Sequence, residues 1–474
     1  MSGLHINLPV ENSSHRSECE RDKEMPYLPL DQHVPVHVLG RRRHGISSGG
    51  SESSYRSKPR MLRRGAISYE RNDAAAEYIR YLGDALAKRP HRQSHSILPE
   101  LPSNKLVKLS VSRRTGRRGS IQQNTPSQCY KDLLKGSVLQ SLGVEGQARM
   151  IQHKLQNVNS WDFDIFAFRR VTEGRPLYHM GLHLFQTHGL ISELKLDILK
   201  VMKFLALIET AYHPDNCYHN CTHAADVTQA LHCLISEPML YGSLSPLELF
   251  ASLVAAMCHD LDHPGVNQSF LLNTSSYLAS IHGRHSLLER HHCHAAKAIL
   301  KESQLLDHLL PDERQEVLSL MEDMILATDV SRNKDFMTQF EEMLVTDRGI
   351  DLSVQAQRHF LLMIAIKAAD ISNPSRCLHL SKTWSEQIME EFFRQGDCER
   401  TMNLPISFLC DRFTTTIPKS QSGFFEFVAL PLFKAWSKLL GSPSSILLVK
   451  NILNNKAYWD AQIPRNHSSD SEED

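Results

Sequence analysis

The sequence lacks the features that mark several common protein classes. Its 10 cysteines show no Cys-x-x-Cys spacing, which argues against a disulfide framework and favours reduced thiols in a cytoplasmic protein. No apolar run reaches the roughly 18 residues of a membrane span, and the charged N-terminus has no apolar core, so we expect neither a transmembrane helix nor a signal peptide. Phosphate-binding Gly-Lys-Ser/Thr segments are also absent, which argues against one frequent hydrolase design.

Charge is distributed unevenly along the chain. The net charge is zero, but residues 1–125 carry 22 Lys and Arg against 12 Asp and Glu. Residues 1–130 are rich in Ser, Arg, Gly and Pro and show little apolar periodicity, so we expect a basic, mostly disordered regulatory region with one short helix over 74–88. Residues 461–474 predict a disordered acidic tail. We expect no nucleic-acid partner.

Near residue 147 the sequence becomes rich in apolar residues at helical spacing, which predicts an all-helical domain over residues 135–460. Apolar positions recur at helical spacing over residues 194–208, as in an amphipathic helix. Ser245 and Glu248 flank a proline as cap and third residue of a typical helix start. Strand-like alternation is nearly absent, which favours an all-α fold. Further helices are expected over residues 286–301, 312–327, 335–344, 353–369, 380–395 and 423–440.

Histidine is concentrated in one stretch, where 11 of the 26 histidines lie between residues 213 and 294. His219 and His223 are four residues apart, so they share one face of a helix. His259 and Asp260 follow an apolar run that must be buried. Imidazole and carboxylate are the ligands that zinc and harder divalent ions prefer, and buried ionisable groups need such pairing. The spacing therefore predicts a metal site.

Each candidate also has a purely structural interpretation. A single buried histidine is usually a hydrogen-bonded core residue rather than a ligand. Asp370 ends a second apolar helix, where the negative end of the helix dipole calls for a cation; that cation could be Lys367 or a metal. Cys221 and Cys258, beside candidate ligands, are small core residues or oxidation-sensitive thiols, with the core role favoured. The joint occurrence of histidines and aspartates favours the metal interpretation.

On these motifs the chain resembles the class I cyclic-nucleotide phosphodiesterases, whose motif order it follows. The matching motifs are Tyr218-His219-Asn220-Cys221-Thr222-His223-Ala224-Ala225-Asp226-Val227, the segment 259–270, Leu288-Glu289-Arg290-His291-His292, Ala327-Thr328-Asp329, Ala369-Asp370-Ile371-Ser372-Asn373-Pro374 and Ser420-Gln421-Ser422-Gly423-Phe424. Within the family, Trp161-Asp162-Phe163-Asp164-Ile165-Phe166 and an N-terminal Arg-Arg-Gly-Ala-Ile-Ser are most similar to the cAMP-specific type-seven branch, whereas Lys419-Ser420-Gln421 is closer to the type-four branch. The resemblance implies a compact multi-helix catalytic domain with an HD-type metal site.

The resemblance implies a hydrolase that converts cAMP to 5′-AMP and so ends cAMP signalling. The implied zinc ligands are His223, His259, Asp260 and Asp370. Asp260 would also bridge to a second ion, magnesium, for which manganese may substitute. A hydroxide between the two metals would attack phosphorus. His219 would protonate the departing 3′ oxygen as general acid, and Glu289 would orient the ring of His219.

The resemblance further implies an outer metal shell and a base pocket. The outer shell, or the surroundings of the phosphate, would hold His263, Asp329 and Asn267 or Gln268. Gln421 would hydrogen-bond the purine edge, with the ring between Phe424 and Ile388. Tyr218 and Asn373 would also line this pocket. Because a glutamine amide can flip, Gln421 alone does not choose between adenine and guanine, and a dual cAMP and cGMP phosphodiesterase is an alternative.

The chemistry of the substrate supports metal-assisted hydrolysis independently of the resemblance. A phosphodiester anion resists attack by an anionic nucleophile, and two cations can neutralise and align both partners. One rival is another nucleotide phosphohydrolase of the wider HD superfamily, against which the base-pocket motif and His219 argue. A second rival is a non-catalytic scaffold, against which the complete ligand set argues. Arg290 could compete for the carboxylate of Glu289, but we expect it to point away.

Two related pentapeptides lie in the basic N-terminal region. Residues Arg63–Ile67 read Arg-Arg-Gly-Ala-Ile, and residues Arg117–Ile121 read Arg-Arg-Gly-Ser-Ile. The second resembles a recognition site of cyclic-AMP-dependent protein kinase with Ser120 as the acceptor, and the first resembles the pseudosubstrate sequence of that kinase. Phosphorylation of Ser120 would add about −1.5 to −2 charge. Solvated basic patches, or binding to an anionic surface, are the alternatives.

Overall fold

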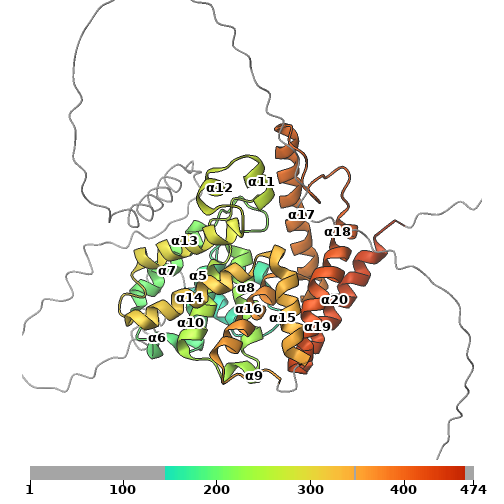
Figure 1. Ribbon diagram of the computed structural model, residues 1–474. Coiled ribbons are helices and arrows are strands. Elements are labelled where there is room, and N and C mark those ends of the chain that lie inside the picture. Colours follow the sequence, from blue (N-terminus) through green and yellow to red (C-terminus); the bar gives the residue numbers. More distant parts are fainter. Residues whose placement is uncertain (1–144, 346–348, 465–474) are drawn as a thin grey trace, which may run out of the picture. The chain divides into compact units, whose positions relative to one another are not determined.

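The structure, a computed structural model, describes residues 145–345 and 349–464, which contain helices and loops but no strand. This confirms the predicted all-α fold class. The helices, labelled as in Figure 1, are α3 (Glu145–Leu155), α4 (Ile165–Val171), α5 (Pro176–Thr187), α6 (Leu190–Glu193), α7 (Ile198–Ala211), α8 (Cys221–Ile235), α9 (Pro238–Tyr241), α10 (Pro246–Cys258), α11 (Gln268–Asn273), α12 (Tyr277–His282), α13 (Leu287–Ser303), α14 (Pro311–Ala327), η3 (Val330–Arg332), α15 (Asn333–Val345), α16 (Gln355–Asp370), η4 (Asn373–Ser375), α17 (Leu378–Thr401), α18 (Ile417–Phe424), η5 (Phe425–Ala429), α19 (Leu430–Leu440) and α20 (Pro443–Ala461).

Several sequence-based expectations fall outside this part of the chain. The short helix over 74–88, both basic pentapeptides and Ser120 belong to residues that the structure does not describe. The domain limits therefore stay a prediction. Within the described residues, no helix combines the length and apolarity needed to cross a membrane.

Local caps explain where two of the predicted helices begin. Ser245 accepts from the backbone N–H of Glu248, whose carboxylate accepts from the N–H of Ser245, so the predicted capping box of α10 is confirmed. The helix expected over 194–208 begins later, at Ile198, because Asp197 accepts from the N–H of Leu199 at 2.8 Å and so caps α7 there. Satisfying these otherwise unpaired N–H groups fixes the first turn of each helix.

The helix expected over 423–440 is present but contains a π-helical turn. The structure has α18, a π-helical turn (η5) and then α19. Pro431, near the start of α19, has no N–H to donate to the carbonyl of Phe427 as an α-helix would require. A π-type turn is a known way for a helix to absorb such an interruption, and it occurs often near functional sites. Gln421 and Phe424 lie just before it.

Four helices pack together in the middle of the described domain. Helix α10 contacts α8, α14 and α16, and α16 also contacts α8 and α14 (Figure 1). Every residue of α10 from Glu248 to Cys258 is buried. Each large apolar side chain buried in this way contributes about 1.5–3 kcal/mol to folding. The chain emerges from this packing at the C-terminal ends of α10 and α16, which is where ligand-type side chains lie.

The loop after α16 is held in place by buried polar contacts. Arg376 is fully buried and donates to Asp226 Oδ1 of α8 at 2.8 Å and to the carbonyl of Trp161 at 2.7 Å. Asn455 of α20 donates to the carbonyls of Pro374 and Arg376 at 2.8 Å. These bonds tie η4, which carries Asn373, to α8 and α20. Asn373, the one predicted pocket residue on this loop, is therefore held in place.

Candidate metal centre and adjoining pocket

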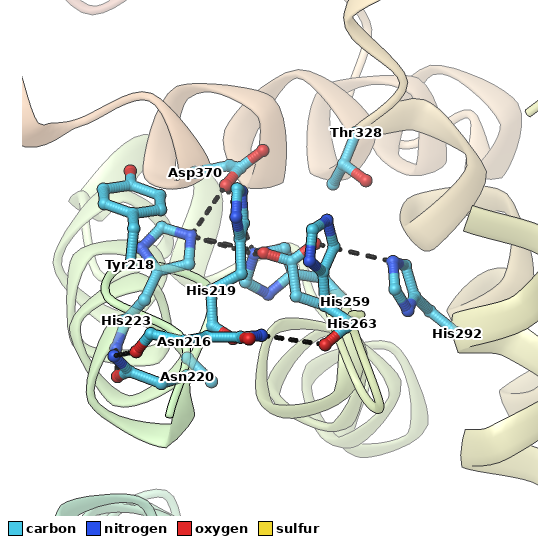
Figure 2. Close-up of polar contacts among 12 residues, drawn as sticks. Asn216, Tyr218, His219, Asn220, His223, His259, His263, His292, Thr328 and Asp370 are labelled. Carbon is cyan, nitrogen blue, oxygen red and sulfur yellow. Dashed lines mark hydrogen bonds and ion pairs between the residues drawn. The ribbon is translucent and has the colours of Figure 1, made fainter. Parts of the chain in front are cut away.

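The nitrogens and oxygens of four predicted ligands converge on one point. One ligand atom from each of His223, His259, Asp260 and Asp370 lies within 4.8 Å of all the others. His259 Nε2 is 3.1 Å from Asp260 Oδ2 and 3.2 Å from Asp370 Oδ1. His223 Nε2 is 3.2 Å from Asp370 Oδ1 and 3.3 Å from His259 Nε2 (Figure 2). His223 and Asp370 are 147 residues apart in the sequence, and the fold brings them together.

Three helices deliver these ligands. His223 lies in the first turn of α8, where Asn220 caps the helix by accepting from the N–H groups of Thr222 and His223. Asp370 is the last residue of α16, and His259 is the C-cap of α10. His259 Nδ1 lies 2.9 Å from the carbonyl of Ala256. With Nδ1–H donated to that carbonyl, the lone pair of Nε2 faces the two carboxylates, an arrangement that requires a cation.

The electric field at this point favours positive charge. Burial by itself would lower the pKa of His259, but the carboxylates of Asp260 and Asp370 raise that pKa well above its ordinary value. Burial would likewise raise the pKa of Asp260 and of Asp370, but the positive charge of His259 holds both well below the ordinary range. A field that binds a proton so tightly also suits a divalent ion. Two imidazoles and two carboxylates are a donor set that fits zinc or another divalent metal.

His219 pairs with Glu391, not with Glu289. His219 Nδ1 contacts Glu391 Oε1 directly, and Glu391 Oε2 accepts from the N–H groups of Tyr218 and His219 at 2.8 and 3.1 Å. The predicted pairing with Glu289 is therefore wrong. Glu391 lies on α17 and is 4% exposed, a position where a carboxylate needs a partner; the burial that points to this pairing is visible only in the structure.

The proton affinity of His219 is high. Burial lowers its pKa, but the nearby carboxylates of Glu391 and Asp260 outweigh burial and raise the pKa to about 9. Glu391 in turn has its pKa lowered to about 2, because the charge of His219 overcomes the effect of burial. The ring of His219 therefore carries a proton at neutral pH, with Nδ1 held by Glu391 and Nε2 available to a ligand.

Glu289 lies in the first turn of α13 and has a different environment. Burial, together with the charges of Asp329 and Asp260, raises the pKa of Glu289 to about 7. Its buried Oε2 has no hydrogen-bond partner among the residues that the structure describes. Arg290 donates instead to the carbonyl of His285 at 3.2 Å, as expected for a side chain that does not pair with Glu289. Glu289 therefore lies within the electrostatic influence of the carboxylates of Asp329 and Asp260.

His263 lies against His219 and is fixed by an unpredicted asparagine. The two imidazole rings stack with centroids 4.0 Å apart. Asn216 donates to the carbonyls of both His219 and His263, at 2.9 and 2.8 Å, and so ties their two loops together (Figure 2). Gly265 has φ +75°, and a Cβ there would meet Asn216 Oδ1 at 2.5 Å. Only glycine fits this approach.

The remaining predicted outer-shell residues serve the surrounding loops. The side chain of Asn267 caps α11 by accepting from the N–H of Phe270. Gln268 accepts from the N–H of Leu287 at 2.8 Å. Asp329 accepts from Ser286 Oγ at 2.6 Å. His292, to which sequence analysis gave no role, lies with Nε2 3.7 Å from Asp260 Oδ1 and Nδ1 2.7 Å from the carbonyl of Leu261.

Two alternatives that the sequence left open have structural answers. Lys367 Nζ donates to the carbonyl of Ala327 at 2.6 Å, so Asp370 keeps its oxygens for the histidines. Cys258 is fully buried, and burial raises the pKa of its thiol far above the usual range. Burial also raises the pKa of Cys221 to about 12. Cys258 is therefore a core residue and Cys221 packs against the core, and both thiols stay protonated at neutral pH.

The predicted base-pocket residues lie on η4, α17, α18 and the loop before α8. Tyr218 Oη accepts from Asn373 Nδ2, which links the start of the histidine segment to η4. Gln421 is 6% exposed and accepts at Oε1 from Ser385 Oγ at 2.8 Å. Ser385 was not predicted. Its hydroxyl fixes the orientation of the amide and leaves Nε2 of Gln421 as a donor for a ligand.

Comparison with known proteins gives two findings. Residues 218–452 match the family model described as 3′5′-cyclic nucleotide phosphodiesterase. The chain is 34% identical over 325 residues to the protein named 3′,5′-cyclic-AMP phosphodiesterase 4C of Mus musculus, an alignment that covers 67% of this chain and 47% of the relative. The chain thus spans about half the length of this curated relative. The family match contains all four ligands, His219, Glu391 and Gln421.

Proposed function

The chain belongs, through residues 218–452, to the 3′5′-cyclic nucleotide phosphodiesterase family, and we propose that it hydrolyses cAMP to 5′-AMP and so ends cAMP signalling. The observation that carries the proposal is the convergence of His223, His259, Asp260 and Asp370 on one point beside the paired His219 and Glu391. The similarity to a relative named as a cAMP phosphodiesterase supports the choice of substrate.

The four converging residues would hold zinc, and Asp260 would also contribute to a site for magnesium or manganese. When bound, such ions supply Lewis acidity and lower the pKa of water, which makes water a nucleophile at neutral pH. The chain itself supplies the negative field that binds them, since Asp260 and Asp370 stay ionised. Glu289 and His292 lie near Asp260. His263 accepts from the N–H of Gly265 and so orders the loop after α10.

His219 would act as the general acid. A leaving alkoxide needs a proton as the 3′ P–O bond breaks, and His219 carries one at neutral pH because its pKa is raised to about 9. Glu391 accepts from Nδ1, so the ring presents Nε2–H to the leaving oxygen. This arrangement orients the ring and keeps it protonated until the transfer.

The purine would bind between Phe424 and Ile388, with Gln421 donating from Nε2 to its edge. Phe424 and Ile388 are partly buried and pack against the core. An amide donor matches an acceptor nitrogen of adenine, but it also matches the carbonyl of guanine. Preference for cAMP over cGMP is therefore the finer part of the proposal. A dual phosphodiesterase is the second candidate, favoured by this ambiguity of Gln421.

The other functional predictions rest on the sequence alone. Assignment to the type-seven branch, a cytoplasmic location, and recognition of Ser120 and of residues 63–67 by cyclic-AMP-dependent protein kinase stay predictions. A different HD-type hydrolase and a scaffold without activity are the outcomes that the following experiment would expose.

The test is hydrolysis of cAMP and cGMP, side by side, by the purified full chain. Each assay includes EDTA, metal readdition and the variant Asp370→Ala. Metal-dependent turnover of cAMP, with little for cGMP and none in the variant, is the expected result. Turnover of both nucleotides would keep the chemistry and refute the specificity. Metal binding without turnover of either nucleotide would refute the proposed function.

A further inference from the structure

The two helices that end in metal ligands are joined at their other ends by an ion pair. Glu248, in the first turn of α10, is 1% exposed. Arg358, in the first turn of α16, places Nε 3.0 Å and Nη2 3.0 Å from Glu248 Oε1. His359 Nε2 lies 3.2 Å from the same oxygen. Ser245 completes the group, since its N–H donates to Glu248 Oε2 at 2.8 Å.

Glu248 and Arg358 lie at similar distances along their helices from the candidate metal ligands. His259 follows Glu248 by eleven residues, and Asp370 follows Arg358 by twelve. At about 1.5 Å of rise per residue these separations are roughly 17 and 18 Å. The two helices contact each other and run in the same direction, because both N-terminal turns meet at the ion pair and both C-terminal ends meet at the ligands. The ion pair therefore fixes one end of a parallel pair whose other end is the site.

Helices α10 and α16 contact each other less extensively than each of them contacts α8 and α14. Their direct contact with each other therefore does little to fix their relative axial position. A slip of one residue would move a ligand by about 1.5 Å, whereas the ligand atoms are 3.1–3.3 Å apart. The ligand geometry therefore requires that the axial register of α10 against α16 be fixed.

We propose that Glu248 and Arg358 are positioning residues that set the axial register of α10 against α16 and thereby the metal affinity of a site about 17 Å away. This inference rests on the proposed function for the identity of the site. Fixing register is the best-attested role of buried ionic pairs. Arg358 also anchors the loop before α16, because its Nη1 donates to the carbonyls of Leu352 and Ser353 at 2.9 and 3.1 Å.

The test measures zinc affinity of the full, metal-stripped chain by competition with a chromophoric chelator. Zinc bound at this site is defined as the binding lost in Asp370→Ala. The variants Glu248→Gln and Arg358→Gln should each weaken the affinity about tenfold, within the range for residues that act on a site without touching it. The double variant should bind zinc about as tightly as each single variant, because the two residues act as a unit. Turnover at limiting zinc should fall and recover at saturating zinc.

Two variants serve as controls. Glu209→Gln removes another buried carboxylate, which accepts from the N–H groups of Leu177 and Tyr178 and pairs with Arg175, on helices that carry no candidate ligand. The control is run at pH 8, where Glu209 is ionised, since burial raises its pKa to about 7. Val201→Ala destabilises α7 by opening a cavity. Both should bind zinc within twofold of the parent chain.

The outcomes separate the two hypotheses. If the parent chain shows no zinc binding that depends on Asp370, the proposed function fails and the positioning role fails with it. If the parent chain binds zinc and Glu248→Gln binds it equally well, the positioning role alone is wrong. An equal loss of affinity in Val201→Ala would also refute it. Should Glu248→Gln not fold, Arg358→Lys keeps the charge and must retain affinity closer to the parent chain than Arg358→Gln does.

Discussion

At the scale of single residues, two glutamates near the site differ in their charge state. Glu391 contacts His219 and has its pKa lowered to about 2, because the positive charge of His219 overcomes burial. Glu289 faces other carboxylates, and burial and their charge raise its pKa to about 7. Of these two glutamates, Glu391 is the one that contacts His219 and stabilises its protonated form. The two residues therefore affect the pH dependence of the reaction differently.

We predict that Glu391→Gln shifts the alkaline limb of the pH–rate profile to lower pH. A general acid works only while protonated, so activity falls as pH rises through its pKa. Glu391 raises the pKa of His219, and its loss lowers that pKa and reduces kcat about 10²-fold. The measurement is kcat against pH for both variants. Glu289→Gln is the control, and a larger shift of its alkaline limb would assign the orienting role to Glu289 after all.

Ser385 gives a second prediction at this scale. Its hydroxyl donates to Gln421 Oε1, which opposes rotation of the amide. In Ser385→Ala the amide flips freely, and the loss of one hydrogen bond of about 1 kcal/mol changes the ratio of kcat/KM for cAMP to that for cGMP about fivefold, towards cGMP. Ser381→Ala, also buried on α17, is the matched control. An unchanged ratio would mean that the amide is fixed by other contacts.

At the scale of elements, the ion pair between α10 and α16 predicts how stability depends on pH. Burial would raise the pKa of Glu248, but hydrogen bonds from His359, Ser245 and Arg358 lower it to about 2 from 4.5. The unfolded chain then binds more protons between these values. The stability that Glu248 contributes is therefore complete above about pH 4.5 and is lost as pH falls through about 2.

The corresponding variant is Glu248→Gln, examined by denaturant unfolding across this range. At pH 7 we expect a loss of about 2 kcal/mol, as for hydrogen bonds to a charged group. The difference from the parent chain should shrink towards pH 2. A difference that stays constant from pH 7 to pH 3 would show that the carboxylate charge contributes nothing. Gln355→Ala, an exposed change on α16, should leave stability unchanged at every pH.

At the scale of the whole molecule, stability depends on what occupies the ligand cluster. Two ionised aspartates and two histidines lie within 4.8 Å at the ends of buried helices. A metal ion that binds only the folded chain stabilises it by mass action. We predict that chelation lowers Tm by on the order of 5 °C, and that zinc restores it. Asp370→Ala should remove the zinc response, and a chelator effect that persists in this variant would assign it to another site.

The helical fold was accessible from the sequence because helix caps and apolar periods are local patterns, whereas the set of candidate ligands came from the resemblance to a family. The capping box at Ser245 and the apolar period of α16 depend on residues that are neighbours in the chain. The exceptions arose where one residue interrupts a pattern. Asp197 begins α7 later than its apolar period suggests. Pro431 follows the π-helical turn that divides the expected helix over 423–440.

Partners in space were not accessible in the same way. His219 and Glu391 are separated by 172 residues, and Ser385 and Gln421 by 36. Nothing in a local pattern distinguishes Glu289 from Glu391 as the partner of His219, since both are glutamates on helices with one apolar face. The sequence by itself determined which residue types could bind metal and move protons, because chemistry belongs to the side chain. Only the tertiary structure decided which of them meet, because helix packing sets those distances.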